Sequence, residues 1–158
     1  MITGGCLCGA IRFKVERFVG PFELCHCSRC RKVSGSAFVA GIGVRARDFH
    51  WVAGEGLVRR YEAPVREHPP GYSTAFCPSC GSPAPDLTHV TAEDDWFELV
   101  AGVLDDDPLL RPDKHIFVDY MAAWDAIHDA LPRLTKQELI ELRIAAYRAK
   151  AKKHRDPE

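Results

Sequence analysis

Seven cysteines, gathered in three tight groups, constrain this chain more than any other feature of its sequence. An odd number of cysteines cannot be fully paired in disulfides, and such close spacing is typical of metal or redox sites. We therefore expect thiolate ligands rather than a disulfide framework. The groups are Cys6 and Cys8, then Cys25, Cys27 and Cys30, and finally Cys77 and Cys80.

The most specific group is the turn Cys77-Pro78-Ser79-Cys80-Gly81, which is typical of a zinc knuckle. Such a turn points two sulfurs at one ion, and Gly81 permits the positive φ that lets backbone N–H groups reach them. A closed structural zinc needs four ligands, so the turn must recruit another pair. Cys6 and Cys8 supply it, and we expect them side by side on extended chain at the start of the first strand. The alternative is two buried structural thiols.

Once four cysteines are assigned to the structural site, Cys25, Cys27 and Cys30 remain, which we call the trio. Three sulfurs are the ligand count of a metal site with an open fourth position, so the trio is the candidate active site. The alternative is a second structural site that a distant histidine closes. His26 lies between two of the sulfurs and in an extended segment points away from them, so we do not expect it to be a ligand. The histidines considered as the distant ligand are His50, His68, His89 and His115.

Length and charge limit the class of protein. The 158 residues, 46% of them hydrophobic, are about one domain's worth. The 21 Lys and Arg nearly balance the 22 Asp and Glu, which argues against a nucleic-acid partner. Apolar runs are too short to span a membrane, and residues 1–6 lack the basic start and apolar stretch of a secretory signal. We expect a cytoplasmic protein with no membrane partner.

Short strands dominate the predicted structure. Residues 10–15 alternate apolar and basic side chains, as a half-buried strand does. Glycines and prolines separate the runs, which favours a mainly β fold of antiparallel sheets. Three prolines predict an exposed loop at 63–71. Further short runs rich in aromatic and β-branched residues lie at 38–44, 49–52, 57–61, 96–100 and 115–120.

Only the C-terminal segment predicts an α-helix. Thr135 and Glu138 have the spacing of a capping box, and apolar residues follow at helical intervals. We expect a helix over about residues 134–152, whose basic last turns suit the negative end of the helix dipole. Its apolar stripe would cover the sheet or form the contact of a homodimer. The predicted organisation is a zinc-binding β domain at 1–134 and a helical extension at 135–158.

With these three cysteine groups and their flanking residues, the chain resembles a known family, the glutathione-dependent formaldehyde-activating enzymes, over roughly residues 3–134. The resemblance implies a fold of packed antiparallel sheets, the Mss4-like fold or β-tent. It also implies a structural zinc on Cys6, Cys8, Cys77 and Cys80 and a catalytic zinc on the trio, so up to two Zn²⁺ per chain. The matching segments are 4–13, 25–32, 76–82, 102–105 and 112–118, with Trp124 beyond them.

Two short segments depart from the family pattern. Members often carry serines after the position of Tyr61 and a basic residue shortly before the knuckle, where this chain has Glu62-Ala63-Pro64 and Ser73-Thr74-Ala75. The carboxylates of glutathione would need cationic partners. The departures therefore bear on the identity of the thiol rather than on the zinc.

The expected activity is that of a zinc-dependent carbon–sulfur lyase or synthase acting on a small thiol–aldehyde adduct, similar to S-(hydroxymethyl)glutathione synthase. Three thiolates on Zn²⁺ would leave a bound sulfur electron-rich, which favours sulfur transfer. The expected partners are a small thiol such as glutathione and an aldehyde such as formaldehyde. Arg29, Arg31 and Lys32 would offset the negative site or hold a substrate carboxylate.

Two other functions compete with the enzyme. One is a non-enzymatic, zinc-stabilised protein-binding module of the same fold, because fold alone does not assign function. The other is a zinc ribbon that binds nucleic acid, which the net charge of −1 disfavours.

Overall fold

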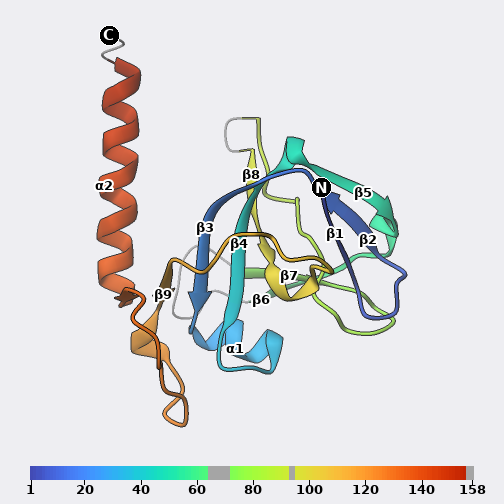
Figure 1. The fold of residues 1–158 in the computed structure, drawn as a ribbon, viewed down its shortest axis with the longest axis horizontal. Helices are drawn as coiled ribbons and strands as arrows, with labels where there is room; N and C mark the ends of the chain where they lie inside the picture. Colours follow the sequence, from blue (N-terminus) through green and yellow to red (C-terminus); the bar gives the residue numbers. More distant parts are fainter. Residues whose placement is uncertain (64–71, 93–94, 156–158) are drawn as a thin grey trace. The chain divides into compact units, whose positions relative to one another are not determined.

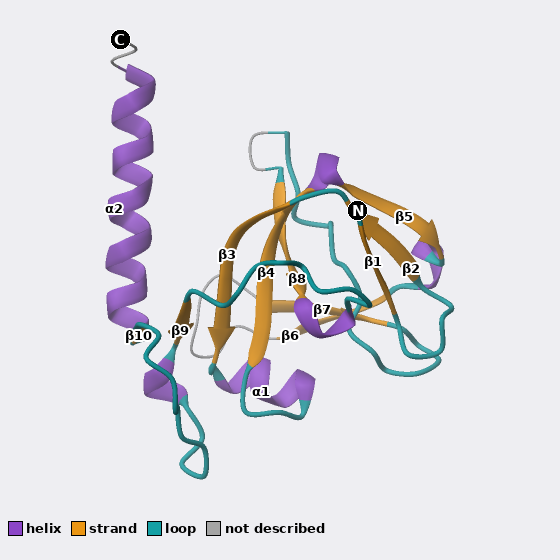
Figure 2. Cartoon of the chain, in the orientation of Figure 1, coloured by secondary structure: helices purple, strands orange, loops and turns teal. Residues whose placement is uncertain are grey.

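The computed structural model describes residues 1–63, 72–92 and 95–155. The chain divides into two compact units, Met1–Glu23 with Ala40–Pro112, and Leu24–Val39 with Asp113–Glu158. Strands and loops make up most of the chain (Figure 1), and α2 is its one long helix among the described residues (Figure 2). The mainly β prediction is therefore confirmed. The loop predicted at 63–71 lies, apart from Ala63, outside the described residues, and the division at 134/135 stays a prediction.

Antiparallel strand pairs build the first unit. One sheet has the order β1-β2-β5, β6 pairs with β7, and β4 pairs with β8. The strands are β1 (Ile2–Gly5), β2 (Arg12–Val15), β4 (Val39–Arg45), β5 (Phe49–Ala53), β6 (Arg59–Ala63), β7 (Tyr72–Phe76) and β8 (Trp96–Val100). The strand β3 (Phe18–Cys25) begins in this unit and ends in the second, to which Val39, the first residue of β4, also belongs. The antiparallel sheets expected from the short apolar runs are confirmed.

Alternating side chains of these strands form the core of the first unit. Phe13 and Val15 on β2 are at most 1% exposed, as the alternation in residues 10–15 predicted. Ile42 on β4 lies opposite Leu99 on β8, and both are buried. Burial of each such side chain contributes about 1.5–3 kcal/mol before the entropic cost of folding. Gly4 must stay small, because a Cβ there would lie 2.5 Å from the Phe13 ring.

The second unit combines two helices with a parallel pair of short strands. Helix α1 (Ser28–Ser34) follows the end of β3, and β9 (Lys114–Ile116) pairs with β10 (Arg133–Leu134). Helix α2 (Lys136–Arg155) begins with the predicted capping box: the Thr135 N–H donates to Glu138 Oε2 at 2.8 Å, and the Glu138 N–H donates to Thr135 Oγ1 at 3.3 Å. The C-terminal helix is thus confirmed, shifted by about two residues.

Two local predictions need correction. The strand expected over 115–120 ends at Ile116, because Phe117 adopts φ 56° and residues Val118–Tyr120 form a 3-10 turn. The sequence also did not predict α1, whose seven residues contain one buried side chain, that of Cys30. The remaining 3-10 turns are Ala46–Asp48, Glu55–Leu57 and Ala101–Val103. Within the described ranges, no helix is both long and apolar enough to cross a membrane.

Candidate metal centres

Four cysteine sulfurs of the first unit meet in one place. The Sγ atoms of Cys6, Cys8, Cys77 and Cys80, which we call the quartet, all lie within 4.8 Å of one another. Cys6 and Cys8 are 3.4 Å apart, and Cys8 and Cys77 are 3.8 Å apart, measured between sulfurs. Zn–S bonds of about 2.3 Å in a tetrahedron separate neighbouring sulfurs by about 3.8 Å. The donor set and its spacing therefore fit a four-thiolate zinc.

Two turns bring the quartet together. The turn after β7 contains Cys77 and Cys80, and it closes through a bond from the Gly81 N–H to the Cys77 carbonyl at 2.9 Å, with Gly81 at φ 74°. Hydrogen bonds with the side chain and backbone of Ser82 lower the pKa of the Cys80 thiol to about 6. This group thus loses its proton readily, as a metal ligand must.

The other half of the quartet lies in a turn rather than on extended chain. The Gly9 N–H donates to the Cys6 carbonyl at 2.9 Å, and the Cys6 N–H donates to the Ile11 carbonyl at 3.0 Å, so Cys6 and Cys8 belong to the tight turn between β1 and β2. The prediction that they begin the first strand was wrong, because Gly9 at φ 77° lets the chain reverse there. The Ile11 N–H donates to Cys6 Sγ at 3.2 Å and so stabilises a thiolate.

The trio lies where β3 gives way to α1 in the second unit. Cys25 ends β3, Cys27 is the N-cap of α1, and Cys30 lies in its first turn. All three side chains are at most 8% exposed, and their sulfurs lie within 4.8 Å of one another. The Cys30 N–H donates to Cys27 Sγ at 3.4 Å, so a sulfur of the trio caps the helix.

The three buried thiols of the trio differ in pKa. Hydrogen bonds from the thiols of Cys25 and Cys30, with backbone N–H groups, lower the pKa of Cys27 to about 2. The same contact with Cys27, together with burial, raises the pKa of Cys25 to about 12, and the two neighbouring sulfurs also raise the pKa of Cys30. Three buried sulfurs cannot all ionise without a cation, so this donor set fits a metal ion.

Among the described residues, no histidine or carboxylate joins the trio as a fourth ligand. His115, one of the four histidines considered for that role, instead contacts His26. His68 lies outside the described residues. In the described part of the chain, the trio is therefore a three-sulfur site, the count expected when the fourth position is open.

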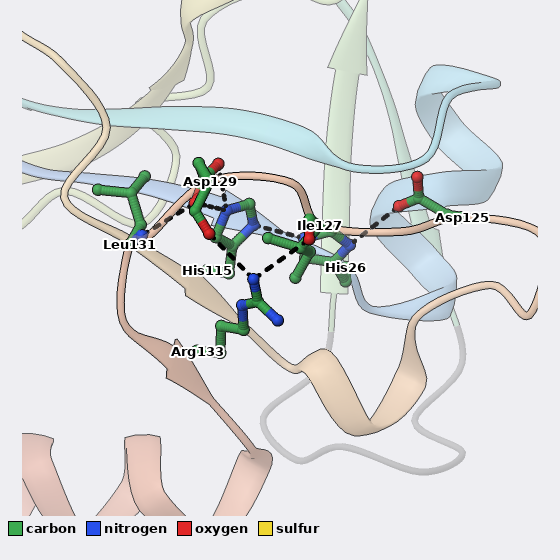
Figure 3. Close-up of polar contacts among 7 residues, drawn as sticks. All are labelled: His26, His115, Asp125, Ile127, Asp129, Leu131 and Arg133. Carbon is green, nitrogen blue, oxygen red and sulfur yellow. Dashed lines mark hydrogen bonds and ion pairs between the residues drawn. The ribbon is translucent and has the colours of Figure 1, made fainter.

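His26 is fully buried, and its ring bonds to His115. Its Nε2 lies 2.8 Å from His115 Nδ1, and His115 Nε2 lies 3.0 Å from Asp129 Oδ2 (Figure 3). Burial lowers the pKa of His26. His26 Nδ1 has no hydrogen-bond partner among the described residues and lies 3.7 Å from Asp125 Oδ2.

The carboxylates of this network were not predicted from the sequence. Asp125 and Asp129 carry no motif, and His115 lies 89 positions from His26. The one available signal was a histidine between two cysteines of the trio, which needs a partner if it is buried. The structure supplies that partner from β9.

A family model and one relative name the same family. The family model of the glutathione-dependent formaldehyde-activating enzymes matches residues 1–120. A Halomonas elongata protein that carries this enzyme name provisionally is 29% identical over 129 residues, which cover 78% of this chain and 79% of that protein. A crystal structure of a Rhodobacter sphaeroides protein is 26% identical, with a TM-score of 0.46, and the match covers 65% of this chain and 87% of that one. The chain belongs to the family of glutathione-dependent formaldehyde-activating enzymes.

Proposed function

We propose that the chain is a zinc-dependent carbon–sulfur lyase and synthase, which joins a small thiol to an aldehyde and reverses that reaction. The observation that carries the proposal is the division of the seven cysteines into a four-sulfur group and a buried three-sulfur group. The family supports glutathione as the thiol and formaldehyde as the aldehyde. In this proposal the quartet holds a structural zinc, and the trio holds the catalytic one.

The reaction needs no oxidant and no further reactant. A C–S bond forms between the thiol sulfur and the aldehyde carbon, the C=O π bond breaks, and the thiol proton ends on the oxygen of the resulting hydroxymethyl thioether. The reverse reaction breaks the C–S bond and returns the proton to sulfur. Zinc on the trio would supply an open position at which a thiol loses its proton and stays nucleophilic.

The residues of the chain prepare this chemistry in three ways. The end of β3 and the first turn of α1 fix the three sulfurs at short spacing. The trio side chains are at most 8% exposed, which limits the access of bulk water to the three sulfurs. Arg29, Arg31 and Lys32 lie on α1 beside Cys30 and supply positive charge near an anionic site. Such cations suit the carboxylates of glutathione.

The test is the rate of exchange between hydrated formaldehyde and its glutathione adduct, followed by ¹³C NMR. The zinc-loaded protein should accelerate exchange in both directions without changing the equilibrium. A second small thiol, such as 2-mercaptoethanol, tests whether the carboxylates of glutathione matter. Exchange at the buffer rate with both thiols would contradict the proposal and favour the zinc-stabilised binding module.

The remaining expectations accompany this proposal. A cytosolic enzyme of this kind would act on small molecules without a nucleic-acid or membrane partner. The homodimer expected from the apolar residues of α2 would leave the proposed chemistry unchanged, because all seven cysteines precede that helix.

A further inference from the structure

A line of three side chains in the second unit has no role in the chemistry proposed above. Asp129, His115 and His26 are joined end to end by hydrogen bonds of 3.0 and 2.8 Å (Figure 3). His26 is 0% exposed and His115 is 3% exposed. Burying polar rings costs free energy unless they are hydrogen-bonded, so two adjacent buried histidines need an explanation.

The Asp129 carboxylate determines which atom donates in each of the two hydrogen bonds. An ionised carboxylate only accepts hydrogen bonds, so His115 must donate to Asp129 from Nε2. In a neutral ring the other nitrogen is then an acceptor, so His115 Nδ1 accepts the Nε2–H of His26. With both rings neutral, each would carry its proton on Nε2, and Asp129 would fix the tautomer and orientation of each.

Asp129 is itself held in place by its own loop. The Leu131 N–H donates to Asp129 Oδ1 at 2.9 Å, and His115 Nε2 lies 3.2 Å from Oδ1 and 3.0 Å from Oδ2. The Arg133 Nη2 group on β10 donates to the carbonyl oxygens of Ile127 and Asp129 at 3.2 and 2.9 Å (Figure 3). The backbone N–H of Leu131 and the contact with His115 lower the pKa of Asp129.

The other end of the line lies in the segment that carries two trio sulfurs. His26 stands between Cys25 and Cys27 in the sequence. Its ring bonds to His115, and its backbone N–H donates to the carbonyl of Ile116, the next residue on β9, at 3.0 Å. Consecutive residues of β9 thus hold His26 at both its ring and its backbone. A rotation of the backbone at His26 would therefore displace the Sγ atoms of both Cys25 and Cys27.

We propose that Asp129 and His115 are positioning residues for the trio, which act through His26 to keep Cys25 and Cys27 in metal-binding geometry. The inference rests on the proposed function, because it takes the trio as a zinc site. Hydrogen-bonded partners outside a ligand set commonly orient the ligands, and their loss costs about 10–100-fold in metal affinity. Here Asp129 and His115 act on Cys25 and Cys27 through His26, the residue between them.

A matched pair of substitutions on one loop isolates this role. Asp129→Asn keeps the size of the side chain and an oxygen for the Leu131 N–H, but it replaces the obligatory acceptor with a group that also donates. Asp125→Asn is the comparison at the other nitrogen of the same ring: Asp125 Oδ2 makes an ion-pair contact of 3.7 Å with His26 Nδ1, but at that distance it forms no hydrogen bond that could fix the tautomer. Asp129 is about half exposed, so the variant should fold.

The first readout is the tautomer of each ring, from ¹⁵N NMR of histidine-labelled, zinc-loaded protein. We expect Nε2–H on both His26 and His115 in the wild type and in Asp125→Asn, and loss of this single tautomer in Asp129→Asn. A purely structural role for Asp129 would not move these resonances in this way. A proton on His115 Nδ1 in the wild type would overturn the proposed direction.

The second readout is the zinc affinity of the trio, by competition with a chelator. We expect Asp129→Asn to weaken the second zinc about tenfold and Asp125→Asn to leave it unchanged. If the wild type and both variants bind two zinc ions, and the trio binds its zinc equally tightly in all three, the positioning role is overturned while the proposed function stands. A wild type that binds zinc only at the quartet would overturn the proposed function instead, while the NMR result would still report the line of hydrogen bonds.

Discussion

Gly81 shows how much the quartet depends on the backbone conformation of one residue. It adopts φ 74°, and its N–H closes the turn that holds Cys77 and Cys80. A Cβ at this position would meet nothing within 4 Å, so the only obstacle to a side chain is the left-handed conformation.

Gly81→Ala should therefore destabilise the protein through backbone strain alone. The expected cost is about 1–2 kcal/mol, or a Tm lower by about 2–8 °C, measured by thermal unfolding of the zinc-loaded protein. Gly56→Ala is the matched control, because its Cβ also meets open space and its φ lies outside the left-handed region. An equal Tm for the two variants would contradict the strain account.

The quartet and its glycine were predictable from the sequence, whereas the partner of His26 was not. Cys77 and Cys80 lie in one turn whose spacing determines its chemistry. The contact of His26 with His115 depends on how two distant segments fold, and neither histidine has a ligand spacing. Asp129 lies on a loop with no pattern of its own.

Among the elements, α2 depends on its first turn for a defined start. A bond from the Thr135 backbone N–H and a second from its hydroxyl lower the pKa of Glu138 below its usual value. A carboxyl with a lowered folded-state pKa stabilises the folded state above its unfolded pKa, and this contribution is lost as pH falls through the folded pKa.

The helical circular dichroism of Glu138→Ala should accordingly be weaker than that of the wild type at pH 7. The difference should shrink as pH falls below the usual carboxyl range near 4.3, because the wild type then loses its charged cap. Glu141→Ala, also on the exposed face of α2, controls for helix propensity. A difference that persists unchanged at low pH would count against the capping role.

The rest of α2 packs little within its own unit. Leu139 is 1% exposed, whereas Ile140, Leu142 and Ile144 are 40–48% exposed. The apolar residues of α2 after Leu139 are therefore only partly covered. The prediction that they form a homodimer contact stays untested.

Removal of residues 135–158 should leave two zinc ions per chain, because every cysteine precedes them. The truncated protein should have a lower Tm, since the burial of Leu139 is lost. Zinc analysis and size-exclusion chromatography measure both effects. Loss of zinc would mean that α2 supports a metal centre, and a smaller assembly would support the dimer.

Sequence patterns predicted the elements with clear alternation or capping, such as β8 and α2, and missed those without either. The seven-residue α1 has the sulfur of Cys27 as its cap and little apolar periodicity. The parallel pairing of β9 with the two-residue β10 depends on the course of the intervening loop. Such short elements are defined by their neighbours rather than by their own residues.

For the whole molecule, the two sulfur groups differ in what they hold together. The quartet joins the turn after β1 to a turn about seventy residues later in the sequence, so its zinc would close a long loop. The trio spans six residues and closes none. Structural zinc contributes on the order of 10 kcal/mol to the folding of small zinc modules.

Cys77→Ser and Cys27→Ser are matched changes at buried cysteines that are 0% and 5% exposed. Cys77→Ser should lose its fold and its metal together, because the binding energy of the quartet zinc is folding energy. Cys27→Ser should remain folded, with one zinc per chain. Circular dichroism and elemental analysis of the two proteins measure this contrast.

The most direct measurement is the thiol–aldehyde turnover of folded Cys27→Ser protein with one zinc per chain. Our account predicts turnover at the buffer rate while the wild type accelerates the reaction, because the quartet alone offers no open position. Wild-type turnover by this variant, or a loss of fold equal to that of Cys77→Ser, would contradict the division into a structural and a catalytic centre.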